Sequence, residues 1–320
     1  MRAVQVTRFG GPEVLEVRQV PDVRAGQGQV VVRVAVADVL FLDTQLRSGW
    51  GGEHFPLHPP YVPGGGVAGT VLSVGPDVPE DLVGRRVVTM TDGGGYAERV
   101  LADAAGLVDV PDELSLPDAA ALLQTGPAAL SLVEAAALEP GEWVLVTAAG
   151  GGLGLLLVQL ARAAGARVVA AAGGARKLDA AGQLGAELTV DYTEPDWTAR
   201  VSAATGGPRV VFDGVGGDLG AAAFSLAARG GRMFAYGVPS GGFAEIDAGE
   251  AQRREITVTG IEQVQFAPAD GTRLAGQVLR AAAQGRVTPV IGRTFPLERA
   301  AEAHAAIESR EVVGRTLLLA

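Results

Sequence analysis

The apolar and polar positions of the chain follow two patterns, one in its first third and one after it. The first third holds short runs of β-type residues with glycine and proline turn signals between them, as in "VPGGGVAG" and "VGPDVPEDLVG". Such turns are typical of tight corners, and they predict an antiparallel, barrel-like β module. The strands predicted here are residues 2–7, 14–20, 29–37, 69–74, 85–90 and 96–101.

From about Pro117 the pattern changes to short apolar strands separated by alanine-rich helices. The predicted strands are "WVLVT", "RVVAAA", "ELTVDY", "RVVFDGV" and "RMFAYGV". The predicted helices between them include "GLLLVQLARAAGA", "ARKLDAAGQLG" and "DLGAAAFSLAARG". These strands are continuously apolar rather than alternating, which indicates burial on both faces of a parallel sheet. The sequence therefore predicts a doubly wound α/β region.

The C-terminal part continues with a sixth strand, "EITVTGI", helices at residues 273–284 and 297–309, and a closing strand, "GRTLLL". The elements after the sixth strand either extend the parallel sheet or return to the β module. The sequence pattern does not decide between these two arrangements. The sixth strand is β-branched and uncharged in its body, so at the edge of the sheet it would expose unpaired backbone groups. We expect a homodimer through this edge; the alternative is a cover supplied by the C-terminal helix.

Composition and charge narrow the class of protein. A chain of 320 residues is long enough for two domains. It contains no cysteine, which excludes disulfides, a thiolate nucleophile and a cysteine-ligated metal. Its formal net charge of -10 argues against nucleic acid as a partner. We find neither a secretory signal nor an uninterrupted membrane-spanning tract, so we expect a cytoplasmic protein without a membrane partner.

The glycine cluster "AAGGGLG", residues 148–154, lies between the strand "WVLVT" and a predicted helix. The chain contains 46 glycines, so the cluster alone is weak evidence, and its context decides. Read as A-x-G-x-x-G, it places Ala149, Gly151 and Gly154 where a tight turn lets a helix N-terminus receive a pyrophosphate. Ala149 departs from the glycine that usually opens this motif. The cluster therefore predicts a dinucleotide site.

The next predicted strand indicates which dinucleotide binds. An NAD site presents an acidic residue to the ribose about twenty residues after the glycine motif. This chain has Gly173, Gly174, Arg176 and Lys177 there, and Lys177 is its only lysine. Two cations suit a 2'-phosphate, so the predicted cofactor is NADPH. Tyr192, at the end of "ELTVDY", either contributes to the same site or is a residue of the strand rim.

Several motifs together resemble the medium-chain dehydrogenase/reductase superfamily. They are "FGGPEVLEV", "LFLDTQLRSG", "VPGGGVAGTVLSVG", "PGEWVLVTAAGGGLGLLLVQLARAAGA", "VFDGVGG" and "RTFPLERAAEAHAAIESREVVGRTLLL". The chain is most similar to the zinc-independent quinone oxidoreductase, or zeta-crystallin-like, branch. This resemblance implies a Rossmann NADPH-binding domain at residues 121–264. It also implies a split, mainly β, GroES-like catalytic domain formed by residues 1–120 and 265–320.

The resemblance also implies site residues. It assigns Lys177 and Tyr192 to the 2'-phosphate, with Arg310 completing that subsite, and it places Tyr236 and Gly237 under the nicotinamide half. The residues expected at the cofactor are Ala149, Gly151, Gly152, Leu153, Gly154, Gly173, Gly174, Arg176, Lys177, Tyr192, Val215, Tyr236, Gly237 and Arg310.

The chain departs from the family pattern on the substrate side. Leu40 and Gln45 stand where this branch usually has asparagine and tyrosine, and only Asp43 of that segment is kept. Pro127 replaces a threonine, and Gly66 replaces a common glutamate. Leu40, Asp43 and Gln45 are the candidates for the substrate cleft, which has lost hydrogen-bonding groups. We find no convincing general acid among them, so we expect water to supply the proton.

A zinc site is not expected. Zinc alcohol dehydrogenases use cysteine and histidine ligands, but this chain has only His54, His58 and His304. His54 and His58 are separated by a proline in "HFPLH", so they cannot form a helical ligand pair. We expect them in a loop.

These features predict an NADPH-dependent oxidoreductase that acts on a small molecule. The leading interpretation is a reductase that transfers hydride to a quinone or an α,β-unsaturated carbonyl compound in a dry cleft. Two alternatives stay open. One is a free-standing enoyl reductase acting on acyl thioesters, and the other is an NADPH-binding redox sensor with little turnover.

Overall fold

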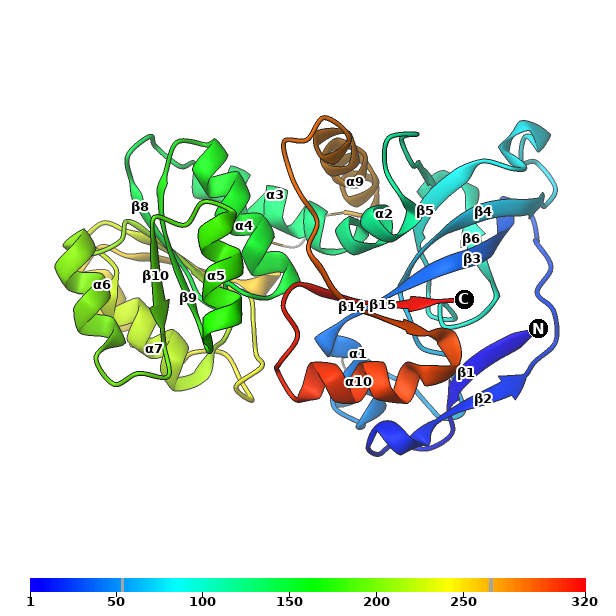
Figure 1. Cartoon of the computed structure of the whole chain (residues 1–320), viewed down its shortest axis with the longest axis horizontal. Coiled ribbons are helices and arrows are strands. Elements are labelled where there is room, and N and C mark those ends of the chain that lie inside the picture. Colours follow the sequence, from blue (N-terminus) through cyan, green and yellow to red (C-terminus); the bar gives the residue numbers. More distant parts are fainter. Residues whose placement is uncertain (53–54, 265–266) are drawn as a thin grey trace. The chain divides into compact units, whose positions relative to one another are not determined.

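The computed structural model describes residues 1–52, 55–264 and 267–320 (Figure 1). The chain forms two compact units. One consists of Met1–Pro127 and Pro268–Ala320, and the other of Ala128–Ala267. The C-terminal segment therefore returns to the first unit, which decides between the two arrangements that the sequence left open. Among the described residues, no helix is long and apolar enough to cross a membrane.

The first unit is built mainly from antiparallel strands. Its strands are β1 (Arg2–Val6), β2 (Leu15–Gln19), β3 (Gln29–Val39), β4 (Gly66–Val74), β5 (Arg86–Met90), β6 (Arg99–Asp103), β7 (Val108–Asp109), β14 (Ile291–Pro296) and β15 (Arg315–Leu319). The β1 and β2 strands form a hairpin, and the larger sheet has the order β14-β15-β3-β4-β5-β7, with β6 also paired to β3. The predicted β module is confirmed.

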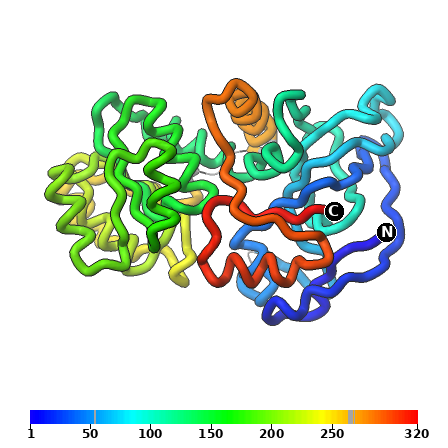
Figure 2. Tube along the Cα trace, in the orientation of Figure 1, coloured from blue at the N-terminus to red at the C-terminus, as the bar shows by residue number. Residues whose placement is uncertain are grey.

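The closing strand makes the return visible: β15 runs antiparallel to β3, with Leu318 opposite Ala37. In Figure 2 this C-terminal red segment lies beside the blue N-terminal strands of the same unit. Leu318 and Ala37 both belong to the buried core of this unit, together with Val32 and Ala303. Burial of these apolar residues holds the distant end of the chain against the first module.

The helices of the first unit pack against this sheet. They are α1 (Phe41–Arg47), α2 (Leu116–Leu123), α9 (Pro268–Ala283) and α10 (Ala300–Glu308), and α3 (Thr125–Ala136) contains the point where the chain passes into the second unit. Short 3-10 helices occur in this unit at Pro12–Val14, Glu80–Leu82, Ala104–Gly106 and Leu297–Arg299, and in the second unit at Ile261–Val264.

Some predicted elements of this unit have different bounds. The strand predicted at 96–101 begins only at Arg99, because Tyr96 and Ala97 are already engaged with β1. The backbone N–H of Val4 donates to the carbonyl of Tyr96 at 2.8 Å. The β14 strand was not predicted from the sequence, because most of its residues are exposed and it lacks a continuous apolar run.

The second unit is the doubly wound α/β region that the sequence predicts. Its strands are β8 (Trp143–Val146), β9 (Arg167–Ala172), β10 (Leu188–Asp191), β11 (Val210–Asp213), β12 (Arg232–Ala235) and β13 (Thr257–Gly260). Its helices are α4 (Gly152–Ala163), α5 (Ala175–Gln183), α6 (Trp197–Thr205), α7 (Gly217–Leu226) and α8 (Ala248–Arg253). All neighbouring strands are parallel, in the order β10-β9-β8-β11-β12-β13.

This strand order places the cofactor motif at the point where the chain changes direction across the sheet. From β8 the chain first moves through α4 and α5 toward β10, and it later moves from β11 through α7 toward β13. Right-handed crossovers then put these helices on opposite faces of the sheet. In such sheets a ligand binds outside the carboxyl ends of the strands at this switch point, which is where β8 and β11 are adjacent.

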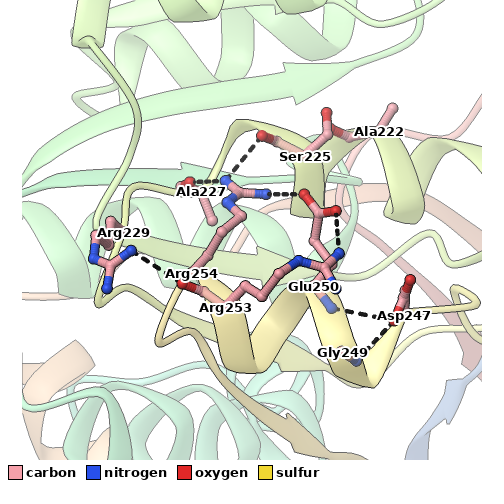
Figure 3. Close-up of polar contacts among 9 residues, drawn as sticks. All are labelled: Ala222, Ser225, Ala227, Arg229, Asp247, Gly249, Glu250, Arg253 and Arg254. Atoms are coloured by element: carbon pink, nitrogen blue, oxygen red, sulfur yellow. Dashed lines mark hydrogen bonds and ion pairs between the residues drawn. The ribbon is translucent and has the colours of Figure 1, made fainter.

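The β13 strand lies at one edge of the sheet, as predicted. Its start is held by Arg254, whose guanidinium donates to the carbonyls of Ser225, at 3.0 Å, and Ala227 at the end of α7 (Figure 3). Arg254 also pairs with Glu250 of α8 at 3.5 Å. These contacts satisfy carbonyls that the helix end leaves free, and they fix where β13 begins.

Candidate cofactor and active site

The glycine cluster forms a tight turn from β8 into α4. Ala148 has φ 50° and Gly151 precedes the first residue of the helix. A Cβ placed on Gly154 would lie 2.8 Å from the Cα of Ala149, closer than side chains approach in folded proteins. The third glycine of the motif is therefore needed for the close packing of the turn against the N-terminus of α4, the end of a helix at which a phosphate binds in such folds.

The predicted phosphate-binding cation meets this turn directly. A Cβ on Gly150 would collide with the side-chain stem of Lys177, whose Cδ would be 2.8 Å away. Lys177 belongs to the first turn of α5, where its backbone N–H donates to the carbonyl of Gly174 at 3.2 Å. Arg176 precedes it and is exposed. The structure thus brings together the two parts of the site that the sequence proposes separately.

Tyr192 lies on the other side of the turn that follows β9. A Cβ on Gly173 would lie 3.4 Å from Cε2 of the Tyr192 ring. The backbone N–H of Tyr192 donates to the carbonyl of Ala172 at 3.3 Å, so the chain stays beside β9 where β10 ends. Gly173, Lys177 and Tyr192 are therefore gathered around one turn.

A buried carboxylate that the sequence does not predict organises the loop after β11. Asp213 has no exposed surface and accepts hydrogen bonds from the hydroxyl of Thr147 at 2.8 Å and from the backbone N–H groups of Val215 and Gly216 at 3.1 and 3.2 Å. The predicted strand "RVVFDGV" therefore ends at Asp213, because the chain folds back onto its carboxylate. The available signal was a polar residue at the carboxyl end of each of two apolar strands, β8 and β11.

Tyr236 and Gly237 lie against this loop. A Cβ on Gly237 would be 2.6 Å from the Cα of Gly214, so only glycine fits at this position. The Tyr236 hydroxyl is buried, and among the described residues it has no hydrogen-bond partner. Burial, assisted by the negative charge of Asp213, raises the pKa of Tyr236, so its hydroxyl keeps its proton. It is an available donor at the carboxyl end of β12.

These features fit a dinucleotide with a 2'-phosphate. The glycine turn offers backbone N–H groups, Lys177 offers a positive charge beside it, and Tyr236 offers a buried donor that no described residue engages. All three follow strands of one parallel sheet at its carboxyl ends. Arg310 follows α10 in the first unit with φ 58°, and its assignment to the phosphate stays a prediction.

The three substrate-side candidates lie at α1: Leu40 precedes the helix, and Asp43 and Gln45 belong to it. Asp43 caps this helix by accepting the backbone N–H of Leu40 at 2.8 Å, and its carboxylate is buried. Leu40 and Gln45 are half-buried. Burial raises the pKa of Asp43 to about 7, although the Leu40 N–H opposes this shift.

Asp43 belongs to an internal polar network that connects distant parts of the chain. The Tyr96 hydroxyl lies 3.4 Å from the Asp43 carboxylate and 3.1 Å from Nε2 of His304 on α10. Burial, with a smaller effect of the Arg47 charge, lowers the pKa of His304 to about 3, so this imidazole is neutral. The network is a feature of the first unit that the sequence analysis did not foresee.

The glycine that replaces the family glutamate also has a structural reason. A Cβ on Gly66 would lie 3.0 Å from Nε2 of Gln124. Gln124 uses this nitrogen to donate to the buried carboxylate of Asp38 at 3.0 Å, and Asp38 forms an ion pair with Arg315. Burial raises the pKa of Asp38, with the Arg315 charge opposing the shift. Gln124 thus occupies the space in which a larger residue at position 66 would begin.

The described residues do not form a metal centre: they contain no group of three or more His, Asp or Glu side chains that could hold a metal ion. His58 lies in a loop, as expected, and His304 lies inside the first unit on α10. His54 lies outside the described residues.

Two family models define the class of protein. The model described as "Alcohol dehydrogenase GroES-like domain" matches residues 26–112, and the one described as "Zinc-binding dehydrogenase" matches residues 152–271. A quinone oxidoreductase of Rattus norvegicus is 33% identical over 325 residues, covering 100% of this chain and 98% of that protein. The chain therefore belongs to the medium-chain dehydrogenase/reductase superfamily, in its quinone oxidoreductase branch, and it is an oxidoreductase.

Solved structures agree on the fold and differ in the nucleotide with which they are described. A quinone oxidoreductase of Escherichia coli, solved in complex with NADPH, is 28% identical with a TM-score of 0.92 and covers 100% of both chains. A protein described as an NAD-dependent alcohol dehydrogenase is 34% identical with a TM-score of 0.90, again over 100% of both chains. Overall similarity therefore does not select the nucleotide for this chain.

Proposed function

We propose that this oxidoreductase is an NADPH-dependent reductase that transfers hydride to a quinone or an α,β-unsaturated carbonyl compound. The observation that carries the proposal is the contact of Lys177 with the glycine turn at Gly150. A cation at this place favours a 2'-phosphate, and the turn after β9, residues 173–177, includes Arg176 but no acidic residue for a free ribose hydroxyl.

The residues of the second unit would hold NADPH at the carboxyl ends of the strands. Backbone N–H groups at the start of α4 bind the pyrophosphate, and Arg176, Lys177 and Tyr192 bind the 2'-phosphate. The Tyr236 hydroxyl would donate a hydrogen bond to the nicotinamide half, while Gly237 lets the chain pass close to the backbone of Gly214. NADPH supplies the hydride, and the protein supplies orientation and a dry environment.

The substrate-side residues favour an apolar, planar acceptor. Leu40 cannot make the hydrogen bonds of the asparagine that it replaces, and Gln45 presents an amide in place of a tyrosine hydroxyl. Asp43 is turned into the interior, where it binds the Leu40 N–H and lies beside Tyr96. With no side chain placed as a proton donor among these candidates, water supplies the proton that completes the reduction.

We also propose that the reaction needs no metal ion. The chain has no cysteine for the ligand sets of zinc dehydrogenases. Elemental analysis of the active protein should show no stoichiometric zinc, and chelators should leave the activity unchanged. Stoichiometric zinc together with loss of activity on chelation would contradict this proposal.

The exposed edge of β13 supports a homodimer. Thr257 and Val258 are exposed, and Val258 has 37% of its surface accessible. The strand body carries no charged residue that would discourage pairing. Pairing with β13 of a second copy across a two-fold axis would satisfy its free backbone groups.

The proposed reaction is tested by following NADPH oxidation with three classes of acceptor: quinones, enones and enoyl thioesters. Turnover with quinones or enones supports the proposal. A clear preference for enoyl thioesters would support the enoyl reductase alternative instead. Tight NADPH binding without turnover of any acceptor would support a redox sensor and contradict a reductase.

A further inference from the structure

The turn that carries the phosphate-binding cations has few restraints of its own. It runs from Gly173 through Gly174 into α5, and Gly174 has φ 90°, a conformation that glycine adopts readily. Gly174 is also the residue that caps α5, and it has no side chain with which to fix the first turn. Another part of the protein must therefore hold the turn in one conformation.

Asp191, the last residue of β10, makes this connection. Its Oδ2 accepts the backbone N–H of Gly174 at 2.9 Å. Its Oδ1 accepts both the backbone N–H and the hydroxyl of Thr193, at 2.9 and 2.7 Å. One carboxylate thus joins the turn after β9 to the segment after β10.

The two segments joined by Asp191 carry the cofactor residues of the proposed function. Lys177 donates its backbone N–H to the carbonyl of Gly174, so the first turn of α5 continues directly from the residue that Asp191 holds. Tyr192 lies between Asp191 and Thr193, and its ring approaches Gly173. A shift of Gly174 would therefore move both the cation and the aromatic ring.

We propose that Asp191 is a positioning residue for the 2'-phosphate subsite, acting through Gly174 rather than by contact with the nucleotide. The inference rests on the proposed use of NADPH. It assigns to a carboxylate a favourable role beside a phosphate, although its charge by itself would repel that group. In this proposal, the hydrogen bond by which Asp191 holds Gly174 favours phosphate binding more than the negative charge of Asp191 opposes it.

The ionisation of Asp191 agrees with this arrangement. The hydrogen bond from the Thr193 hydroxyl, followed by those from the backbone N–H groups of Thr193 and Gly174, lowers the pKa of Asp191, although partial burial opposes the shift. At neutral pH the group is a carboxylate with acceptors on both oxygens. Replacement by asparagine removes the charge and keeps one acceptor oxygen, which can accept the Gly174 N–H while the amide nitrogen faces Thr193, so it tests the bond to Gly174 without the charge.

The test measures the dissociation constants of NADPH and NADH for the full-length wild type and for Asp191→Ala and Asp191→Asn. Asp191→Ala loses the charge-assisted bond to Gly174. Its dissociation constant for NADPH should therefore rise by about tenfold, and its dissociation constant for NADH by less than about twofold. Asp191→Asn should restore NADPH binding to within about threefold of the wild type. The kcat at saturating NADPH should be unchanged in both variants.

Two further variants distinguish positioning from general stability. Thr193→Ala removes one bond to Asp191 but keeps the bond to Gly174, so it should leave the ratio of the NADPH and NADH constants unchanged. Asp196→Ala removes an exposed carboxylate that makes no capping bond to α6 and should also leave the ratio unchanged. Equal weakening of both nucleotides by Asp191→Ala, or no weakening of NADPH, would overturn the inference. Failure of the proposed function would appear separately, as a wild type that does not prefer NADPH.

Discussion

The side chain of Lys177 lies across Gly150, so closely that a Cβ on this glycine would be 2.8 Å from the Cδ of the lysine. The contact joins the first turn of α5 to the turn between β8 and α4. It gives the only lysine of the chain a fixed place beside the predicted pyrophosphate site. The residue predicted to select the nucleotide and the glycine motif predicted to bind its pyrophosphate are therefore in direct contact.

Replacement of Lys177 by Ala should raise the NADPH dissociation constant by about tenfold or more, because a charge-assisted contact to a phosphate is lost. The NADH constant should change little, since NADH lacks the 2'-phosphate. Fluorescence titration of the purified variant with both nucleotides measures this. Arg286→Ala, which removes an exposed cation paired with Gln284, is the matched control. Equal weakening of both nucleotides would argue against the assignment.

The Tyr236 hydroxyl offers a second test on the nicotinamide side. Replacement by Phe removes a buried group without a partner among the described residues, so the free energy of unfolding should be unchanged or rise by up to about 1 kcal/mol. In contrast, kcat/KM for NADPH should fall by about three- to tenfold, because a donor to the nicotinamide half is lost. Thermal unfolding and steady-state kinetics measure the two effects. A variant that loses stability while keeping full kcat/KM would place the hydroxyl outside the cofactor site.

Asp43 should make stability depend on pH in an unusual direction. Burial raises its pKa from 3.8 to about 7, so the folded state holds a proton that the unfolded state releases. The stability that Asp43 contributes is complete below about pH 4 and is lost as the pH rises to about 7. An asparagine at this position does not titrate, and its amide oxygen can still accept the Leu40 N–H.

We therefore expect Asp43→Asn to gain stability relative to the wild type as the pH rises from about 4 to about 7, measured by denaturant unfolding at each pH. His304 acts in the opposite direction. Burial lowers its pKa from 6.5 to about 3, so its contribution to the free energy of unfolding is lost as the pH falls. A stability difference between Asp43→Asn and the wild type that stays constant across this range would show that Asp43 does not titrate there.

The proposed dimer can be tested on a single strand. Thr257 donates its backbone N–H to the carbonyl of Gly231 at 3.0 Å, toward β12. Because backbone groups alternate sides along a strand, the N–H of Val258 points away from β12. Val258→Pro should therefore abolish pairing between subunits while keeping the β12 contact of Thr257.

Sedimentation at micromolar concentration should give the wild type a mass near twice 32.6 kDa and the Val258→Pro variant a mass near 32.6 kDa. Circular dichroism serves as the control for folding. A wild type that remains monomeric at this concentration would rule out the dimer.

The sequence predicts the sheet of the second unit well, because continuous apolar runs are a local signal of burial on both faces. The edge position of the sixth strand and the position of the glycine turn were also predicted, whereas the order of the other strands came from the structure. The contact of Lys177 with Gly150 could not be predicted from the sequence, because it depends on how the first turn of α5 packs against the turn between β8 and α4.

The polar networks inside the protein were not predictable for the same reason. Tyr96 and His304 are separated by 208 positions and meet only because α10 packs in the unit formed by both ends of the chain. Asp213 and Asp191 each end an apolar strand, and the sequence does not indicate that their carboxylates hold loops. Patterns along a chain identify strands, whereas the partners of a buried carboxylate depend on tertiary packing.

The nucleotide preference of the wild type tests the central claim most directly. Steady-state oxidation of NADPH and of NADH should be followed with a para-quinone as the acceptor, under identical conditions. We predict that kcat/KM for NADPH exceeds that for NADH by at least about tenfold, because Arg176 and Lys177 bind a phosphate that only NADPH carries. Equal or greater kcat/KM for NADH would contradict the account.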